Sequence, residues 1–115
     1  MNSIISEHIN DLFDPYDLFS YRGKQKIRNT IKAICVGISD QEIKEAEDYL
    51  DSFYNYCLKY ADILAEKYKT PFLPKEEDAQ KEISEYVSEC KKQYPEIDAK
   101  KIVGIFSNVC WLANR

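Results

Sequence analysis

The chain has 115 residues, of which 44% are hydrophobic and 31% are charged, with only three glycines and four prolines. This composition is typical of a single globular domain and excludes a disordered chain, which would hold fewer apolar residues. The formal net charge of −4 argues against broad binding of nucleic acid. No apolar run approaches the roughly 18 residues of a membrane span, and no signal peptide is visible, so we expect no membrane association.

The first predicted helix covers residues 3–13. Ser3 can cap its start, and Asp14–Pro15 ends it. Its apolar stripe consists of Ile5, Ile9, Leu12 and Phe13. Residues 16–21 are predicted to form a turn that directs two apolar side chains into the core, namely Leu18 and Phe19.

A second helix is predicted over residues 23–36, and Gly37 ends it because glycine readily adopts the left-handed conformation that follows many helices. Its buried face consists of Ile27, Ile31, Ile34 and Cys35. The stretch between Asp17 and Asp40 holds no acidic residue, and its cations lie largely on the opposite side of this helix. They are Arg22, Lys24, Lys26, Arg28 and Lys32.

This run of cations has two interpretations. Cations along a helix can contact phosphates, which makes a nucleic-acid-binding regulator using Arg22–Lys32 the alternative function. The other interpretation is a solvated face that pairs with the protein's own carboxylates. The acidic net charge and the lack of a second basic element favour it, so we expect nucleic acid not to be the partner.

The longest predicted element is an amphipathic helix over residues 39–70, around which the other helices are expected to pack. Ser39 and Glu42 have the spacing of a capping box. Pro71 disfavours helix at the residue before it. Apolar side chains recur every three or four residues and so share one face. They are Ile43, Ala46, Leu50, Phe53, Cys57, Ala61, Leu64 and Tyr68.

A second, narrower strip follows the same helix. Tyr49, Tyr56 and Ile63 recur at seven-residue intervals, and Tyr60 lies beside them. Either neighbouring helices flank the central helix on two sides, or the strip is exposed for a partner. Burial within the chain is the simpler interpretation, because large apolar residues at helical spacing are usually core.

Two more helices are predicted, over residues 75–93 and 99–113. The connector before them carries Phe72 and Leu73 between two prolines, and we expect these side chains to close one end of the core. The last helix is apolar on nearly every side, which predicts burial inside a bundle; a homodimer interface is the alternative. The sequence therefore predicts an all-α single domain, residues 1–115, with about five helices around the central one.

Residues that carry enzyme or metal chemistry are sparse here. The one histidine, His8, has no upstream Arg of the kind that HEPN-type ribonucleases use. The four cysteines lack metal-ligand spacing, and there is no Glu-x-x-His motif, EF-hand loop or glycine-rich phosphate loop. We therefore expect a non-enzymatic protein without metal or cofactor, with reduced cysteines inside the cell. An acid–base pair assembled only by the fold would escape this search.

The carboxylates of the central helix form the predicted partner-binding surface. With two tyrosines they lie on or beside one face: Glu45, Asp48, Tyr49, Asp51, Tyr56, Asp62 and Glu66. Carboxylates accelerate association with basic partners, and tyrosines supply contact area at a small entropic cost. An ordinary solvated helix face is the alternative.

In size, acidity and helical content the chain resembles bacterial immunity proteins, which neutralise toxin domains such as the nucleases of colicins or of contact-dependent inhibition systems. The stretch Asp51–Tyr56, in which Tyr54 and Tyr56 accompany an acidic residue, is similar to the acid-and-tyrosine patch of nuclease immunity proteins. The resemblance implies a cytoplasmic, stoichiometric inhibitor that covers a basic toxin surface. It assigns no role to an individual residue, since the tyrosines here are not adjacent.

Overall fold

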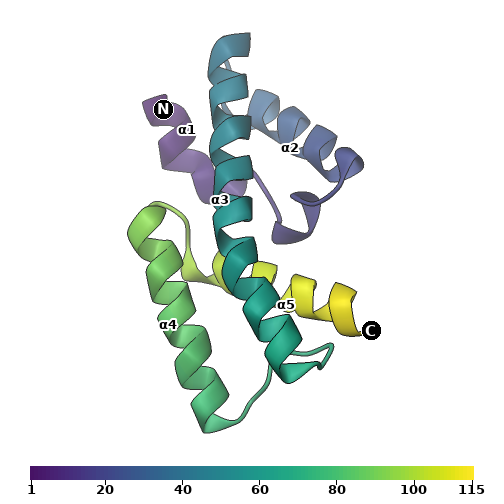
Figure 1. Ribbon diagram of the computed structural model, residues 1–115. Coiled ribbons are helices and arrows are strands. Elements are labelled where there is room, and N and C mark those ends of the chain that lie inside the picture. The colour runs from purple at the N-terminus through teal and green to yellow at the C-terminus, as the bar shows by residue number, and fades with distance from the viewer.

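The computed structural model describes all 115 residues, and all its regular elements are helices. The longest is α3, Asp40–Tyr68, which spans about 43 Å at the standard helical rise. It runs nearly the full 47 Å length of the molecule, and the other helices pack along it (Figure 1). The predicted all-α fold around a central helix is therefore confirmed.

The ends of α3 form as its sequence predicts. The hydroxyl of Ser39 accepts a hydrogen bond from the Glu42 N–H at 3.1 Å, and the Glu42 carboxylate accepts one from the Ser39 N–H at 3.0 Å. Residue 39, the predicted first residue of this helix, is therefore its N-cap, and the helix begins at Asp40. The helix ends two residues before Thr70, because Lys69 takes a left-handed conformation with φ of 49° while its N–H still bonds to the carbonyl of Ala65.

Four other α-helices and two short 3₁₀ turns complete the chain: α1 Ser3–His8, η1 Ile9–Asp11, η2 Pro15–Asp17, α2 Tyr21–Ile34, α4 Glu77–Gln93 and α5 Ala99–Asn114. The N-terminal half of α3 lies beside α1 and α2 (Figure 1). The C-terminal half lies beside α4, which runs back antiparallel to it, and α5 crosses behind α3. No helix is long and apolar enough to cross a bilayer.

Several predicted boundaries need correction. The first helix does not reach residue 13: α1 stops at His8, and the 3₁₀ turn η1 follows. Its cap is Asn2 rather than Ser3, because the Asn2 side chain accepts the Ile4 N–H at 2.8 Å. The second helix starts two residues early, at Tyr21, since Ser20 caps it, and it ends at Ile34. The fourth starts two residues late, at Glu77, and the last includes Asn114.

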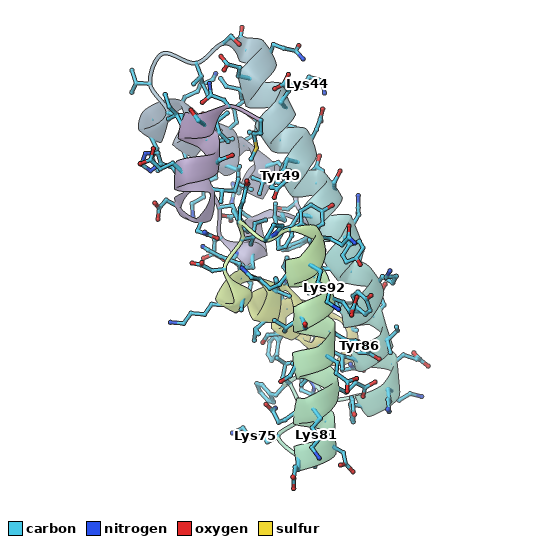
Figure 2. The ribbon with its side chains drawn as sticks, turned by 90° about the vertical axis from the view of Figure 1, so that its left-hand side faces the viewer. Lys44, Tyr49, Lys75, Lys81, Tyr86 and Lys92 are labelled. Carbon is cyan, nitrogen blue, oxygen red and sulfur yellow. The ribbon has the colours of Figure 1, made fainter.

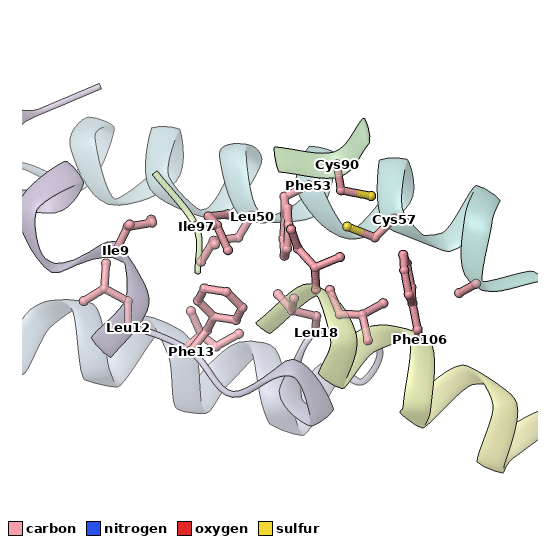
Figure 3. Packing of buried hydrophobic residues seen from close by; sticks show 14 of the residues in the cluster. Ile9, Leu12, Phe13, Leu18, Leu50, Phe53, Cys57, Cys90, Ile97 and Phe106 are labelled. Carbon is pink, nitrogen blue, oxygen red and sulfur yellow. The ribbon is translucent and has the colours of Figure 1, made fainter. Parts of the chain in front are cut away.

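The core is one cluster that contains residues of every helix and of the connectors between them. Phe53 lies near its centre, fully buried, and its ring meets those of Phe13 at 5.9 Å and Tyr94 at 5.3 Å. Figure 3 shows Leu18, Leu50 and Ile97 around this point. The connectors thus close the middle of the molecule, between the two sets of helices.

Some side chains predicted to be buried are exposed. Ile34 is the last residue of α2 and lies beyond the core, whereas its neighbour Cys35 is buried. Phe19 and Phe72 lie in connectors and project outward. In α5, Trp111 and Leu112 are exposed, because this helix crosses α3 instead of lying inside a ring of helices (Figure 1). The prediction that α5 is buried all round is therefore wrong for its last turn and for Val103, which is exposed too.

Two glycines allow η2 to pack closely against two helices. A Cβ at Gly23 of α2 would stand 2.1 Å from the carbonyl oxygen of Asp17, and a Cβ at Gly104 of α5 would stand 2.8 Å from the Pro15 ring. Both contacts are closer than a side chain permits. The turn η2 is therefore wedged between α2 and α5, and the absence of two side chains makes this arrangement possible.

All four cysteines are free and buried: Cys35, Cys57, Cys90 and Cys110. Cys57 of α3 and Cys90 of α4 lie side by side in the core (Figure 3). A hydrogen bond to Cys90 and burial raise the pKa of the Cys57 thiol, and burial raises the pKa of the thiols of Cys35 and Cys110. The same hydrogen bond with Cys57 lowers the pKa of the Cys90 thiol. Burial is therefore the feature that all four thiols share and that reduces their reactivity.

We expect Gly23→Ala to lower the free energy of unfolding by about 3 kcal/mol, the upper end for overpacking, because the new Cβ meets rigid backbone. Gly104→Ala should cost about 1 kcal/mol, since it meets a side-chain ring. Urea unfolding measures both. In an unobstructed helix the same change stabilises by about 0.5–1 kcal/mol. Increased stability of Gly23→Ala would therefore contradict the close packing of η2 against α2. Gln25→Ala on the exposed side of α2 is the control.

We expect the four native thiols to react with an aromatic disulfide reagent at least about a hundredfold more slowly than in the unfolded chain, since reaction requires opening of the core. Stopped-flow absorbance measures the rate. A Ser52→Cys variant, exposed on α3, is the control and should react rapidly. A native thiol that reacts at the unfolded rate would show that the core is not closed around it.

Candidate functional site

The carboxylates predicted to bind a partner fall into two groups. Glu45, Asp62 and Glu66 are exposed and lie outside every ion pair of the chain. Asp48 is exposed too, with Lys44 at 3.4 Å on the next turn. We call these four residues the outer face of α3.

Asp51, by contrast, lies on the side of α3 that faces α2. Its carboxylate is 3.5 Å from the ammonium group of Lys24. Both side chains of the pair are about half exposed. Ion pairs that are exposed to solvent contribute little to stability. Asp51 therefore borders α2 rather than the outer face, and the structure does not bring all the predicted carboxylates together.

The two predicted tyrosines lie on the opposite side of α3, toward α4. The rings of Tyr49 and Tyr56 meet that of Tyr94 at 5.4 and 5.8 Å, and Tyr60 stacks on Tyr86 at 4.8 Å. Tyr49, Tyr56 and Tyr60 are each partly buried against the core. The tyrosine strip is thus mainly a contact between α3 and the α4 region. The predicted burial of the strip is wrong for Ile63, which is exposed. Tyr49 and Tyr56 present only part of each ring to solvent, beside the outer face.

A polar contact that sequence reasoning missed joins α3 to α4. The carboxylate of Glu82 accepts hydrogen bonds from the hydroxyls of Tyr68 at 2.6 Å and Tyr86 at 2.7 Å, and from the ammonium group of Lys67 at 3.0 Å. Figure 2 shows Tyr86 on the side of α4 next to α3. The Tyr68 and Tyr86 hydroxyls, and then Lys67, hold the pKa of Glu82 below its usual range. The same bond raises the pKa of Tyr86 to about 12.

The predicted basic helix is largely neutralised by the chain itself. The guanidinium group of Arg28 makes a bidentate contact with Glu47, at 2.6 and 3.1 Å, which raises the pKa of Arg28. Lys26 lies 3.6 Å from Asp17, and Lys24 contacts Asp51 as described. Of the five cations of this helix, only Arg22 and Lys32 lie outside the ion pairs of the chain. This is the arrangement expected of a solvated face that pairs with its own carboxylates.

A groove that the sequence did not indicate lies between α5, η2 and the connector after α3. It has a volume of about 260 Å³ and is lined by Tyr16, Pro71, Phe72, Ser107, Asn108 and Trp111. Three of these are aromatic and substantially exposed: Phe72 by 67%, Tyr16 by 55% and Trp111 by 45%. The sequence signal was the unusually apolar last helix, which was assigned to the core.

The groove also contains the one buried polar side chain of the protein. Asn108 is 5% exposed, and its amide Nδ2 has no hydrogen-bond partner. A buried donor without an acceptor costs about 1–3 kcal/mol. Nearby, the Asn114 amide donates to the carbonyl of Ala65 at 3.1 Å and so ties the end of α5 to α3. The rings of Phe72 and Trp111 have their centroids 6.0 Å apart.

No protein-family model, curated protein or solved structure matches this chain. The chain also has no group of three or more His, Cys, Asp and Glu side chains placed to hold a metal ion. Two surfaces stand out by their exposed side chains: the outer face of α3, with the tyrosine edges beside it, and the aromatic groove on the α5 side.

The contact at Glu82 predicts a specific dependence of stability on pH. Because its pKa is lowered on folding, the contact stabilises fully above the usual Glu value of about 4.3, and this contribution is lost as pH falls through the lowered pKa. Glu82→Gln should therefore reduce stability at neutral pH and flatten the loss of stability below about pH 4.3. Urea unfolding across this range measures it, with exposed Glu85→Gln as control. If the stability of Glu82→Gln fell on acidification as steeply as that of the parent, the Glu82 contact would not be the source of this pH dependence.

Proposed function

We propose that this chain is a non-enzymatic protein-binding module: an inhibitor of the immunity type that binds a basic protein domain through the outer face of α3. The partner surface would be cationic, as on a nuclease toxin domain. The complex would form in the cytoplasm, where buried thiols remain reduced. Inhibition would be stoichiometric, because covering the partner's surface requires no chemistry.

The observation that carries the proposal is the uneven pairing of charge. The chain neutralises most of its basic helix internally, through Glu47, Asp17 and Asp51, while Glu45, Asp62 and Glu66 are exposed without an ion-pair partner. Lys59 lies on the same side of α3, outside every ion pair, with its ammonium group 4.6 Å from the centre of the Tyr56 ring. Because the unpaired carboxylates there outnumber this cation, the free charge on this side of α3 is mainly negative. Such a face attracts cationic surfaces and increases the rate of encounter.

The same observation weighs against nucleic acid as the ligand. A phosphate-binding helix must present free cations to the backbone. Of the cations on α2, three are within 4.0 Å of the chain's own carboxylates, and Arg22 and Lys32 are two turns or more apart. The two remaining free cations of α2 are too far apart to form a phosphate-binding surface of this kind.

The test compares two triple variants of equal charge. Glu45→Lys, Asp62→Lys and Glu66→Lys reverse the outer face, whereas Glu7→Lys, Glu76→Lys and Glu85→Lys reverse exposed carboxylates elsewhere. Tagged proteins capture partners from lysate of the source cells at low and moderate salt, and mass spectrometry and a nucleic-acid stain identify what is bound. Purified partner is then used to measure the association rate.

We expect one basic protein in stoichiometric amount, with an association rate that falls roughly tenfold or more for the outer-face variant and much less for the control. Equal rates for the two variants would contradict the proposal. A contrary result is capture of nucleic acid that is released by salt and is no longer captured by the Arg22→Ala and Lys32→Ala variants. That result would favour the nucleic-acid-binding regulator over the inhibitor.

A further inference from the structure

We propose that the aromatic groove on the α5 side is a second binding site, which holds an extended peptide segment of a partner protein. The segment would place one large apolar side chain against Phe72, Trp111 and Tyr16, and a backbone carbonyl next to Asn108. This groove contains no residue of α3, so the inference does not depend on the proposed function of the outer face.

The chemistry of the groove identifies the kind of ligand. None of its six lining residues is charged, so it offers nothing to a phosphate or a carboxylate beyond single hydrogen bonds. Its volume of about 260 Å³ lies below the roughly 300–1,000 Å³ of sites for small molecules and cofactors. A site of this size and polarity fits one or two apolar side chains of a polypeptide.

The buried amide of Asn108 supplies the second, independent observation. Its Nδ2 has no acceptor within the chain, and its side chain lines the groove. Buried donors in proteins are almost always paired. A backbone carbonyl of a bound segment provides the acceptor, and only extended or loop segments have carbonyls free, because helices use theirs internally.

The area of the patch favours a short segment over a second copy of the chain. The exposed parts of the three aromatic rings amount to roughly 300 Å². A stable interface between two proteins buries about 800 Å² on each partner. The groove therefore resembles an anchor for a few residues more than the centre of a homodimer interface.

The tryptophan in the groove makes a direct experiment possible. Trp111 is the only tryptophan in the chain, so its fluorescence reports on this groove alone. The probe is a displayed library of short linear random peptides, selected on the full chain. Selected peptides are synthesised and titrated against the parent, Asn108→Leu, Phe72→Ala and the control Val36→Ala, which removes an exposed apolar side chain elsewhere.

We expect the selected peptides to share a large apolar residue and to change Trp111 emission on binding. The dissociation constant should rise about tenfold or more for Asn108→Leu and for Phe72→Ala, and stay within about twofold for Val36→Ala. Thermal unfolding checks that each variant is folded. Phe72 lies in an exposed connector, so Phe72→Ala keeps the test valid if Asn108→Leu does not fold.

Three results would overturn the proposal. One is a selection that enriches no peptide. Another is a set of peptides that bind both groove variants as tightly as the parent or leave Trp111 emission unchanged. The third is a parent chain that sediments as a dimer and becomes monomeric on Phe72→Ala, which would assign the groove to a second copy of the chain.

Discussion

The fold is governed by one constraint: α3 is far longer than any helix available to cover it. Its 29 residues extend for about 43 Å, whereas α4, the next longest with 17 residues, extends for about 25 Å. No single partner can bury the apolar stripe of α3. Different helices therefore cover its two halves, and the connectors fill the space between them around Phe53 (Figure 3). The close packing of η2 against Gly23 and Gly104 joins the two sets of helices.

The packing of helices along α3 also decides which charged side chains are paired. Because α2 packs beside the N-terminal half of α3, its cations come within reach of carboxylates on α3 and η2, and Glu47, Asp51 and Asp17 pair with them. The outer face of α3 has no neighbouring helix, so its carboxylates remain in water. A chain whose sequence contains one strongly basic segment thus presents a mainly acidic long face.

The crossing of α5 behind α3 has the opposite consequence at the C-terminal end. The middle of α5 is buried, and its last turn still contacts α3 through the Asn114 amide, which donates to the carbonyl of Ala65. Trp111 in the same turn is nevertheless exposed, and the connector after α3 and the turn η2 bring Phe72 and Tyr16 next to it. The groove lies where three segments distant in sequence meet, and it contains the one buried amide that the chain itself does not satisfy.

Most of the local structure could be predicted from the sequence, although several helix ends could not. The capping box at Ser39, the stop before Pro71 and the three-and-four spacing from Ile43 to Tyr68 specify α3, because helix caps and amphipathic faces depend on neighbours within a few residues. Which of the predicted surfaces remain free depends instead on how the helices pack together. Tyr49 and Asp51 belong to one predicted patch, yet they face different neighbours, since α4 and α2 pack on opposite sides of α3. The exposure of Trp111 depends likewise on the crossing angle of α5, which is set by long-range packing and leaves no signal in the periodicity of a single helix.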